Sequence, residues 1–451
     1  ALSQMWRKLT CATARFLTGH AHQTIIRQEK SLSNVVVGLD IGTCFVRAVI
    51  GIVHEDNSVE IVDVAKRPSM GLLRNGAIVN IEATSKCISE VIDDAEQNSG
   101  LEASSVIVGI GGVQIESINS KGVVAISSYG KKERAVTQED VERVIECANS
   151  IHFPSDRKLL HLIPQTYYVD KTDIGKNPIG NIACKLEAEV HIITASATSV
   201  ANITRCVGQT MYTLNEVMLK TLACSDAVML EDEKKLGSVL IDIGGGTTDV
   251  IVIVNDAPIC TCSIPVGGNM VTSDISIVKG LPTSIAEKIK LEGGCCWLPM
   301  VETHDEEVII PGFGSRGSEL TSKVELCSII EPRMKEIFEM VRKEIKQKLS
   351  GVQFSGSIIL TGGGSEIPGA VELAEAVFRT SSVRLGIPQG HGGLEDKYRY
   401  PEWATAVGLI LSQKRYAESD EKRNHKSKRK SFESDEDKKE GVLTKFMRKF
   451  F

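Results

Sequence analysis

The chain has 451 residues, too many for one typical domain, so two to four domains or subdomains are expected. Its 42% apolar and 24% charged residues are close to the soluble average, and a net charge of -6 argues against a general nucleic-acid-binding protein. The 12 cysteines lack the paired CxxC spacing of a zinc site. The sequence contains no run of about 18 apolar residues, the length needed to span a bilayer.

Residues 1–33 form a basic N-terminal extension. Lys and Arg residues stand here among Ser, Thr and Ala, with Glu29 as the single acid. This composition is typical of an organellar transit peptide, but a disordered tail or a mis-called start codon would look the same. We expect a disordered or artefactual extension, with the transit peptide as the alternative.

Two similar segments, far apart in the chain, each predict a β-hairpin. Residues 35–53 read VVVGLDIGTCFVRAVIGIV, and residues 239–254 read VLIDIGGGTTDVIVIV. In each, a β-branched run passes through Asp-Ile-Gly and a turn of glycine and threonine into a second β-branched run. A hairpin duplicated at this separation indicates two related lobes rather than a solenoid, whose repeat would be much shorter.

Between the two hairpins, helical and strand patterns alternate, which predicts an α/β fold. Residues 85–96 and 137–148 have helical apolar spacing, and the second helix should begin with Thr137 as N-cap and Asp140 three positions later. The expected strands are residues 105–110, 161–169 and 188–194.

A third glycine turn lies towards the C-terminal end. Residues 358–360 are expected to form a strand and residues 370–378 an amphipathic helix. The turn between them contains Gly362, Gly363 and Gly364.

The last part of the chain divides into a linker and an amphipathic segment. Residues 413–440 are mainly charged residues and serine, so they cannot bury enough apolar surface to offset chain entropy and should form a flexible linker. In residues 441–451, GVLTKFMRKFF, a helix would place apolar side chains on one face and cations on the other, as interfacial membrane helices do. A helix docked on the protein's own core is the alternative. The apolar residues are Val442, Leu443, Phe446, Met447 and Phe450, and the cations are Lys445, Arg448 and Lys449.

The glycine turns suit phosphate binding, because successive backbone N–H groups of such a turn form a concave anion site. No GxxxxGK[ST] motif is present and no GxGxxG opens a helix, so neither a P-loop nor a dinucleotide fold is expected. Asp40 and Asp242 precede the two turns and are candidate ligands for Mg²⁺, held mostly through water. The candidate phosphate-binding residues are Gly42 and Thr43 in the first turn, and Gly244, Gly245, Gly246 and Thr247 in the second.

These motifs resemble those of the actin, Hsp70 and sugar-kinase superfamily. DIGT at 40–43, DIGGGTTD at 242–249 and TGGG at 361–364 are similar to its phosphate-1, phosphate-2 and adenosine motifs. The resemblance implies two α/β lobes with ATP and Mg²⁺ in the cleft between them. It also implies that Glu287 and Lys290 lie at the ribose and adenine edge, although an exposed i, i+3 ion pair is an equal alternative.

Within the superfamily, the chain resembles the bacterial cell-division family FtsA from about residue 34 to 415, and again in the terminal helix. The similar segments are VTQEDVERVI (136–145), LIPQTYYVD (162–170), KNPIGN (176–181), PVGGNMVTSDI (265–275), IIEPR (329–333) and TAVGLIL (405–411). The resemblance adds Gly267 and Gly268 to the expected nucleotide site. Residues 1–33 are not a feature of this family, and residues 299–322 are only loosely similar to it.

The resemblance to FtsA implies a two-lobed actin-like ATPase fold. In this fold an inserted subdomain 1C replaces actin's subdomain 1B, and an amphipathic helix follows at the C-terminus. The expected parts are a basic extension (1–33), subdomain 1A (34–103 and 189–236), subdomain 1C (104–188), subdomain 2A (237–264 and 329–400), subdomain 2B (265–328), the closing helix of 1A (401–412), the linker (413–440) and the membrane-targeting helix (441–451).

The same resemblance implies a function in assembling the division septum. The protein would bind ATP, polymerise head to tail and tether FtsZ filaments to anionic lipid at the cytoplasmic face of the inner membrane, together with other division proteins. Arg333 and Glu336 would contact the C-terminal peptide of FtsZ, although Arg333 could instead cap its own helix. ATPase activity would be slow at most, and no catalytic residue is assigned. A small-molecule kinase of the same fold is the alternative function.

Overall fold

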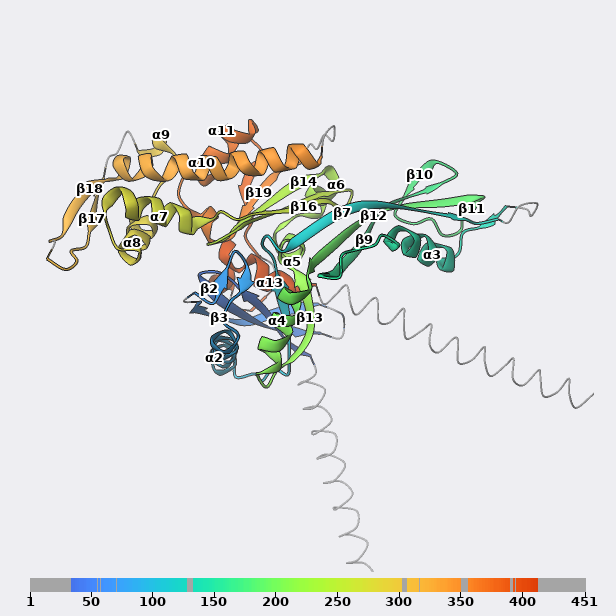
Figure 1. Cartoon of the computed structure of the whole chain (residues 1–451), viewed down its shortest axis with the longest axis horizontal. Coiled ribbons are helices and arrows are strands. Elements are labelled where there is room, and N and C mark those ends of the chain that lie inside the picture. The colour runs from blue at the N-terminus through green and yellow to red at the C-terminus, as the bar shows by residue number, and fades with distance from the viewer. Residues whose placement is uncertain are drawn as a thin grey trace, which may run out of the picture.

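The computed structural model describes residues 34–412, except residues 55, 57, 70, 128–132, 302–305, 316, 350–355, 390, 391 and 394. Two five-stranded mixed sheets lie at the centre of this region, with helices packed on them (Figure 1). The predicted residues 1–33, 413–440 and 441–451 lie outside the described residues. None of the described helices is both long and apolar enough to cross a membrane.

The first sheet has the strand order β13-β6-β1-β2-β3. Strand β1 is buried at every position, as expected of a continuous β-branched run in the middle of a sheet. It pairs antiparallel with β2, confirming the first predicted hairpin, and parallel with β6. The strands are β1 (Val35–Ile41), β2 (Phe45–Val53), β3 (Val59–Pro68), β6 (Ser105–Ile110) and β13 (Thr213–Leu219), and the short strands β4 (Leu73–Arg74) and β5 (Ala77–Ile78) pair nearby.

The second sheet repeats this arrangement in the order β20-β19-β14-β15-β16. Its β14–β15 pair is antiparallel, confirming the second predicted hairpin, and β19 is parallel to β14. In both sheets the hairpin has a parallel strand on one side and an antiparallel strand on the other, which agrees with the two related lobes predicted from the duplicated motif. The strands are β14 (Ser238–Ile243), β15 (Thr248–Val254), β16 (Ala257–Ile264), β19 (Ile358–Thr361) and β20 (Val383–Leu385).

Two helices, α5 and α13, pack against each other between the sheets, and one face of the second sheet contributes to the core of the first lobe. Strand β14 shows how: Leu240 packs with the core of the first lobe, whereas Val239 and Ile241 face the core of the second. This alternation follows from the two-residue period of a strand. The helices against the sheets are α2 (Ile81–Ser99), α4 (Ala197–Gly208), α5 (Lys220–Val228), α6 (Glu231–Leu236), α10 (Lys323–Lys348), α11 (Ala370–Phe378) and α13 (Ala404–Leu411), with the short helices η1 (Gly363–Glu366), η2 (Pro401–Trp403) and α12 (Glu395–Tyr398).

A smaller unit, which we call the inserted unit (residues 115–196), interrupts the first lobe between β6 and α4 and has a core of its own. Helix α3 packs on its sheet, and a Cβ at Gly122 would lie 2.1 Å from the carbonyl oxygen of Val144, so glycine allows this close approach. Thr137 and Asp140 form the predicted capping box. The elements are β7 (Ile115–Ala125), β8 (Arg134–Ala135), α3 (Gln138–Asn149), β9 (Arg157–Val169), β10 (Thr172–Gly175), β11 (Ile182–Ala183) and β12 (Lys185–Ser196).

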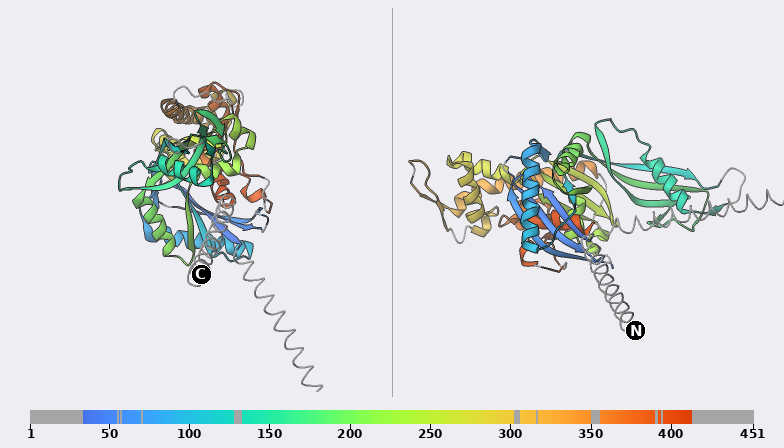
Figure 2. Two further views of the ribbon diagram at one scale, coloured as in Figure 1. Left: turned by 90° about the vertical axis from the view of Figure 1, so that its right-hand side faces the viewer. Right: turned by 90° about the horizontal axis from the view of Figure 1, so that it is seen from below.

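A helical unit extends from the second lobe. It consists of α7 (Gly268–Lys279), α8 (Thr283–Gly293), α9 (Leu298–Val301), β17 (Glu307–Ile310) and β18 (Glu319–Ser322), packed against the start of α10. The helical unit and the inserted unit lie at opposite ends of the molecule (Figure 2).

The predicted bounds of several elements were too short. Helix α2 begins at Ile81 rather than residue 85, because the side chain of Asn80 accepts a hydrogen bond from the backbone of Ala83 and caps the helix there. Strands β9 and β12 also extend beyond residues 161–169 and 188–194, because they pair with each other along almost their whole length.

Candidate functional site

A cavity of about 950 Å³ lies between the two lobes, and the three glycine turns meet around it. They come from the β1–β2 turn, the β14–β15 turn and the end of β19. The predicted residues that line the cavity are Asp40, Gly42, Thr43, Asp242, Gly244, Gly245, Thr247, Gly268, Glu287, Lys290, Gly362, Gly363 and Gly364. Gly246 and Gly267 do not line it: Gly246 packs against Thr43 of the first turn, and Gly267 packs against Gly244 of the second.

Close packing explains the glycines of the second turn. A Cβ at Gly245 would lie 2.3 Å from the Cys44 Sγ, and one at Gly246 would lie 2.8 Å from the Thr43 Oγ1. Gly267 is equally constrained, because its Cβ would lie 2.4 Å from the carbonyl oxygen of Gly244. None of these three has a positive φ. The glycines therefore let the tips of the two hairpins approach each other across the cleft.

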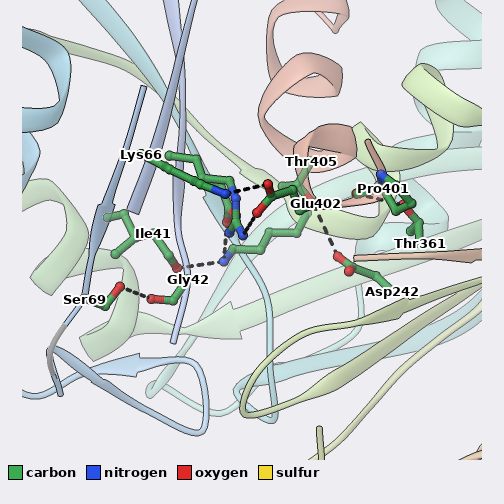
Figure 3. Close-up of polar contacts among 12 residues, drawn as sticks. Ile41, Gly42, Lys66, Ser69, Asp242, Thr361, Pro401, Glu402 and Thr405 are labelled. Atoms are coloured by element: carbon green, nitrogen blue, oxygen red, sulfur yellow. Dashed lines mark hydrogen bonds and ion pairs between the residues drawn. The ribbon is translucent and has the colours of Figure 1, made fainter. Parts of the chain in front are cut away.

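Gly362 in the third turn has a different requirement. Its φ is 78°, in the left-handed region that favours glycine. A Cβ there would also lie 2.2 Å from the Asp242 Oδ1. The Thr361 hydroxyl and the Gly362 N–H both donate to the carbonyl oxygen of Pro401, so η2 holds the turn beside the cavity (Figure 3).

Three carboxylates gather at the ends of the hairpin strands. Asp40 ends β1 next to the first turn, Asp242 lies near the end of β14, and Asp249 lies at the start of β15. Asp249 accepts a hydrogen bond of 3.1 Å from the Gly112 N–H of the first lobe, and Asp242 accepts one of 3.3 Å from the Thr405 hydroxyl (Figure 3). Burial, and then the charges of Asp249 and Asp40, raise the pKa of Asp242 to about 7. Burial also raises the pKa of Asp249.

This group of carboxylates suits a divalent cation. Hard cations bind carboxylate oxygens, and Mg²⁺ usually keeps several waters. Among the described residues, no group of three or more His, Cys, Asp or Glu is placed to hold a metal by itself. Asp40 and Asp242 both line the cavity, so these two carboxylates fit a Mg²⁺ ion held largely through water.

Lysine and arginine side chains complete the cavity wall, and sequence reasoning missed them. The ammonium of Lys220 lies 2.6 Å from the Asp40 Oδ1 and donates to the carbonyl oxygen of Ile41 at 2.7 Å. Arg47 and Lys66 each donate to Glu402 at 2.7 Å, the second contact being drawn in Figure 3. A cation within an otherwise apolar segment, as at positions 47 and 220, was the available signal.

Glu287 and Lys290 are the i, i+3 ion pair considered from the sequence, with a nitrogen–oxygen distance of 2.7 Å. The pair is not simply exposed, because Lys290 is buried and donates to the Thr272 hydroxyl at 3.0 Å and the Gly268 carbonyl at 3.3 Å. Thr272 donates in turn to Glu287. The pair therefore ties α8 to α7 at the wall of the cavity.

Arg333 and Glu336 do not line this cavity. Both lie on α10 and contact each other. The guanidinium of Arg333 also makes two bonds to Asp274 on α7, at 2.6 and 3.0 Å. Arg333 thus joins two helices instead of capping its own. The predicted tail residues 442–450 lie outside the described residues.

Comparisons with known proteins agree with this architecture. The family model "Cell division protein FtsA" matches residues 239–408, and "SHS2 domain inserted in FTSA" matches residues 112–194. Cell division protein FtsA of Borreliella burgdorferi is 41% identical over 378 residues, which cover 84% of this chain and 90% of that protein. FtsA of Escherichia coli K12 is 38% identical over 383 residues, covering 83% and 89%.

A solved structure, the PilM-PilN type IV pilus biogenesis complex, has a similar fold. It superimposes with a TM-score of 0.60 at 18% identity, covering 83% of this chain and 97% of that chain. The fold is thus the mixed α/β fold of actin-like ATPases, built on two five-stranded mixed sheets. With relatives about 40% identical over most of their length, the chain belongs to the FtsA family of cell division proteins.

Proposed function

We propose that this FtsA protein binds ATP and Mg²⁺ between its lobes, polymerises head to tail and tethers FtsZ filaments to the cytoplasmic face of the inner membrane. The main support is the cavity lined by both glycine turns, the second of which leaves no room for a side chain at Gly245. Family membership favours this function over a small-molecule kinase.

Each predicted residue takes one role in this proposal. The turns at Gly42–Thr43 and Gly244–Thr247 bind phosphates, and Asp40 and Asp242 hold Mg²⁺ through water. Gly267 and Gly268 support the second turn. The adenosine part of ATP lies against Gly362–Gly364, with Glu287 and Lys290 at the edge of its ribose and adenine. Bound Mg²⁺ would neutralise phosphate charge.

The subdomains are part of the same proposal. The first sheet with its helices corresponds to subdomain 1A and the second to 2A, and the helical unit corresponds to 2B. The inserted unit corresponds to 1C, which is supported by the inserted-domain match over residues 112–194.

Two surfaces would attach the partners. The side chain of Glu336 is half exposed on α10 beside Arg333, and this pair would contact the acidic and apolar C-terminal peptide of FtsZ through a charge-assisted bond. The terminal helix would bind anionic lipid, with other division proteins nearby at the septum. A heterologous head-to-tail contact between copies would extend into a filament.

Co-sedimentation with anionic liposomes and FtsZ, with and without Mg-ATP, tests these claims together. We expect the protein to carry FtsZ into the pellet, and Mg-ATP to increase its own pelleting through avidity of a filament. Asp242→Ala should weaken Mg-ATP affinity at least tenfold, about 1.4 kcal/mol. ATP consumption that rises with small hydroxylated substrates would instead indicate a kinase.

Removing the tail separates membrane binding from the other functions. Burial of Phe446 and Phe450 in lipid should contribute about 2 kcal/mol each, and each nearby cation about 1 kcal/mol. Deleting residues 441–451, or introducing Phe446→Glu, should therefore abolish pelleting with liposomes and leave ATP binding unchanged. Continued pelleting of the truncated protein would show that another surface binds the membrane.

A further inference from the structure

Lys220 reaches the carboxylates through a channel shaped for its side chain. Two glycines, Gly109 in β6 and Gly111 just after it, make room for the side chain. A Cβ at Gly109 would lie 2.9 Å from the Lys220 Cγ, and one at Gly111 would lie 3.1 Å from the Lys220 Cδ. The side chain is only 15% exposed, and its ammonium contacts both Asp40 and the carbonyl oxygen of Ile41. The backbone around Lys220 therefore positions its ammonium group beside the first phosphate turn.

The position of Lys220 in its helix supports the same interpretation. It is the first residue of α5, where the helix dipole is positive and disfavours a cation. The unfavourable position is offset by the three carboxylates, since the charge of Lys220 also acts on Asp242 and Asp249. Arg47 is the next cation, but it lies 3.7 Å from Asp40 and is bonded to Glu402.

We propose that Lys220 is a resident cation of the phosphate site, which takes part of the charge-compensating role of Mg²⁺ and so reduces the dependence of nucleotide binding on the metal. This inference rests on the proposed binding of ATP. Three carboxylates would repel a polyphosphate strongly, and a fixed ammonium beside the phosphate turn lowers that repulsion whether or not metal is present. Without Lys220, the same carboxylates would depend on Mg²⁺ alone.

The test compares the full-length wild type with Lys220→Met and Lys220→Arg. ATP affinity is measured by calorimetry in excess Mg²⁺ and in EDTA, and the ratio of the two affinities gives the metal dependence. We expect this ratio to be at least tenfold larger for Lys220→Met than for the wild type, and Lys220→Arg to restore most of the difference. Lys234→Met is the matched control, because Lys234 forms a similarly buried ion pair with Asp226 outside the cavity. Its ratio should equal that of the wild type.

A second measurement needs no nucleotide. Mg²⁺ alone should raise the melting temperature of Lys220→Met by more than that of the wild type, because the uncompensated carboxylates bind the metal more tightly. Equal ratios and equal Mg²⁺ shifts in the two proteins would overturn the inference while leaving ATP binding intact. A wild type that does not bind ATP even in Mg²⁺ would overturn the proposed function, and this inference with it.

Discussion

Asp242 is a buried acid whose ionisation should affect both stability and metal binding. Its pKa of about 7 lies above the ordinary value near 4, so between these values the folded protein binds more protons than the unfolded chain. The contribution of Asp242 to folding is therefore greatest at low pH and is lost as the pH rises through 7. Burial is the largest cause of this shift, and the charges of Asp249 and Asp40 add to it.

Asp242→Asn should remove this pH dependence. In the absence of Mg²⁺, the stability of the wild type relative to the variant should fall by about 1.4 kcal/mol between pH 6 and pH 8, because burial disfavours the ionised form of Asp242. Urea unfolding of both proteins at each pH measures the difference. A constant difference across this range would show that Asp242 is already ionised at pH 6.

Gly245→Val should weaken nucleotide binding by separating the hairpins. The new side chain would occupy the position of the Cys44 sulfur, only 2.3 Å from the Cβ, so the turns must move apart. We expect ATP affinity to fall at least tenfold, about 1.4 kcal/mol, by calorimetry. Gly317→Val is the control, because no atom lies within 4 Å of a Cβ at that position. Equal affinity in both variants would mean that the turn does not contact phosphate.

At the scale of secondary structure, helices α7 and α10 are joined by two ion pairs, Lys279–Glu325 and Asp274–Arg333, the second of which lies at the proposed partner surface. Arg333 binds both oxygens of Asp274 and also contacts Glu336. These bonds hold the pKa of Arg333 above its ordinary value, mainly through Asp274. The same guanidinium thus stabilises the helical unit and lies where FtsZ is proposed to bind, so a single substitution cannot separate the two roles.

A charge exchange separates them. Arg333→Glu should lower the melting temperature, because two carboxylates would then face each other, and should abolish FtsZ recruitment to vesicles. The double variant with Asp274→Arg restores the opposite charges between the helices, so it should recover stability. We expect FtsZ recruitment to remain lost in the double variant, since the surface charge is still reversed. Recovery of both properties would mean that Arg333 acts only by joining α7 and α10.

At the scale of the whole molecule, the inserted unit belongs to the first lobe by sequence but is bonded to the second. Ser117 and Gln165 donate to the carbonyl oxygens of Thr261 and Pro258 on the edge strand β16, at 3.0 and 2.9 Å. His191, buried at this contact, lies 2.6 Å from the Asn119 Oδ1 and 2.9 Å from the Thr261 Oγ1. Any change in the angle between the lobes must therefore move or break this contact.

Substituting His191 should loosen the contact between the inserted unit and β16. His191→Ala leaves polar groups at the contact without a partner, which should cost about 1–3 kcal/mol. Burial lowers the pKa of His191 to about 4, so the wild type should lose this contribution as the pH falls from 6.5 towards 4, whereas the variant should not. Denaturant unfolding at pH 7 and pH 5 measures both effects. A variant with unchanged stability and the same pH dependence would contradict this role.

The amino-acid sequence by itself determined the features that depend on local patterns. The β-branched runs around Asp40 and Asp242 predicted both hairpins, and the glycine turns predicted phosphate-binding loops, which the superfamily resemblance assigned to one cleft. Thr137 and Asp140 likewise predicted the start of α3, because a capping box is formed by residues three positions apart. The glycine motifs indicated the fold by their resemblance to the superfamily, and connecting segments such as residues 162–170 and 265–275 indicated the family.

Only the tertiary structure showed the contacts between distant segments. Lys220 is separated from Asp40 by most of the first lobe, and the space for its side chain is left by Gly109 and Gly111, in and just after β6. The ion pair between Arg333 and Asp274, and the hydrogen bonds from the inserted unit to β16, also join distant elements. The local sequence of one element does not indicate that it contacts the other. Such contacts depend on how strands and helices pack, and short-range periodicity contains no information about packing partners. Local sequence therefore determined the loops of the site, whereas the charges around them were decided by the assembly of the two lobes.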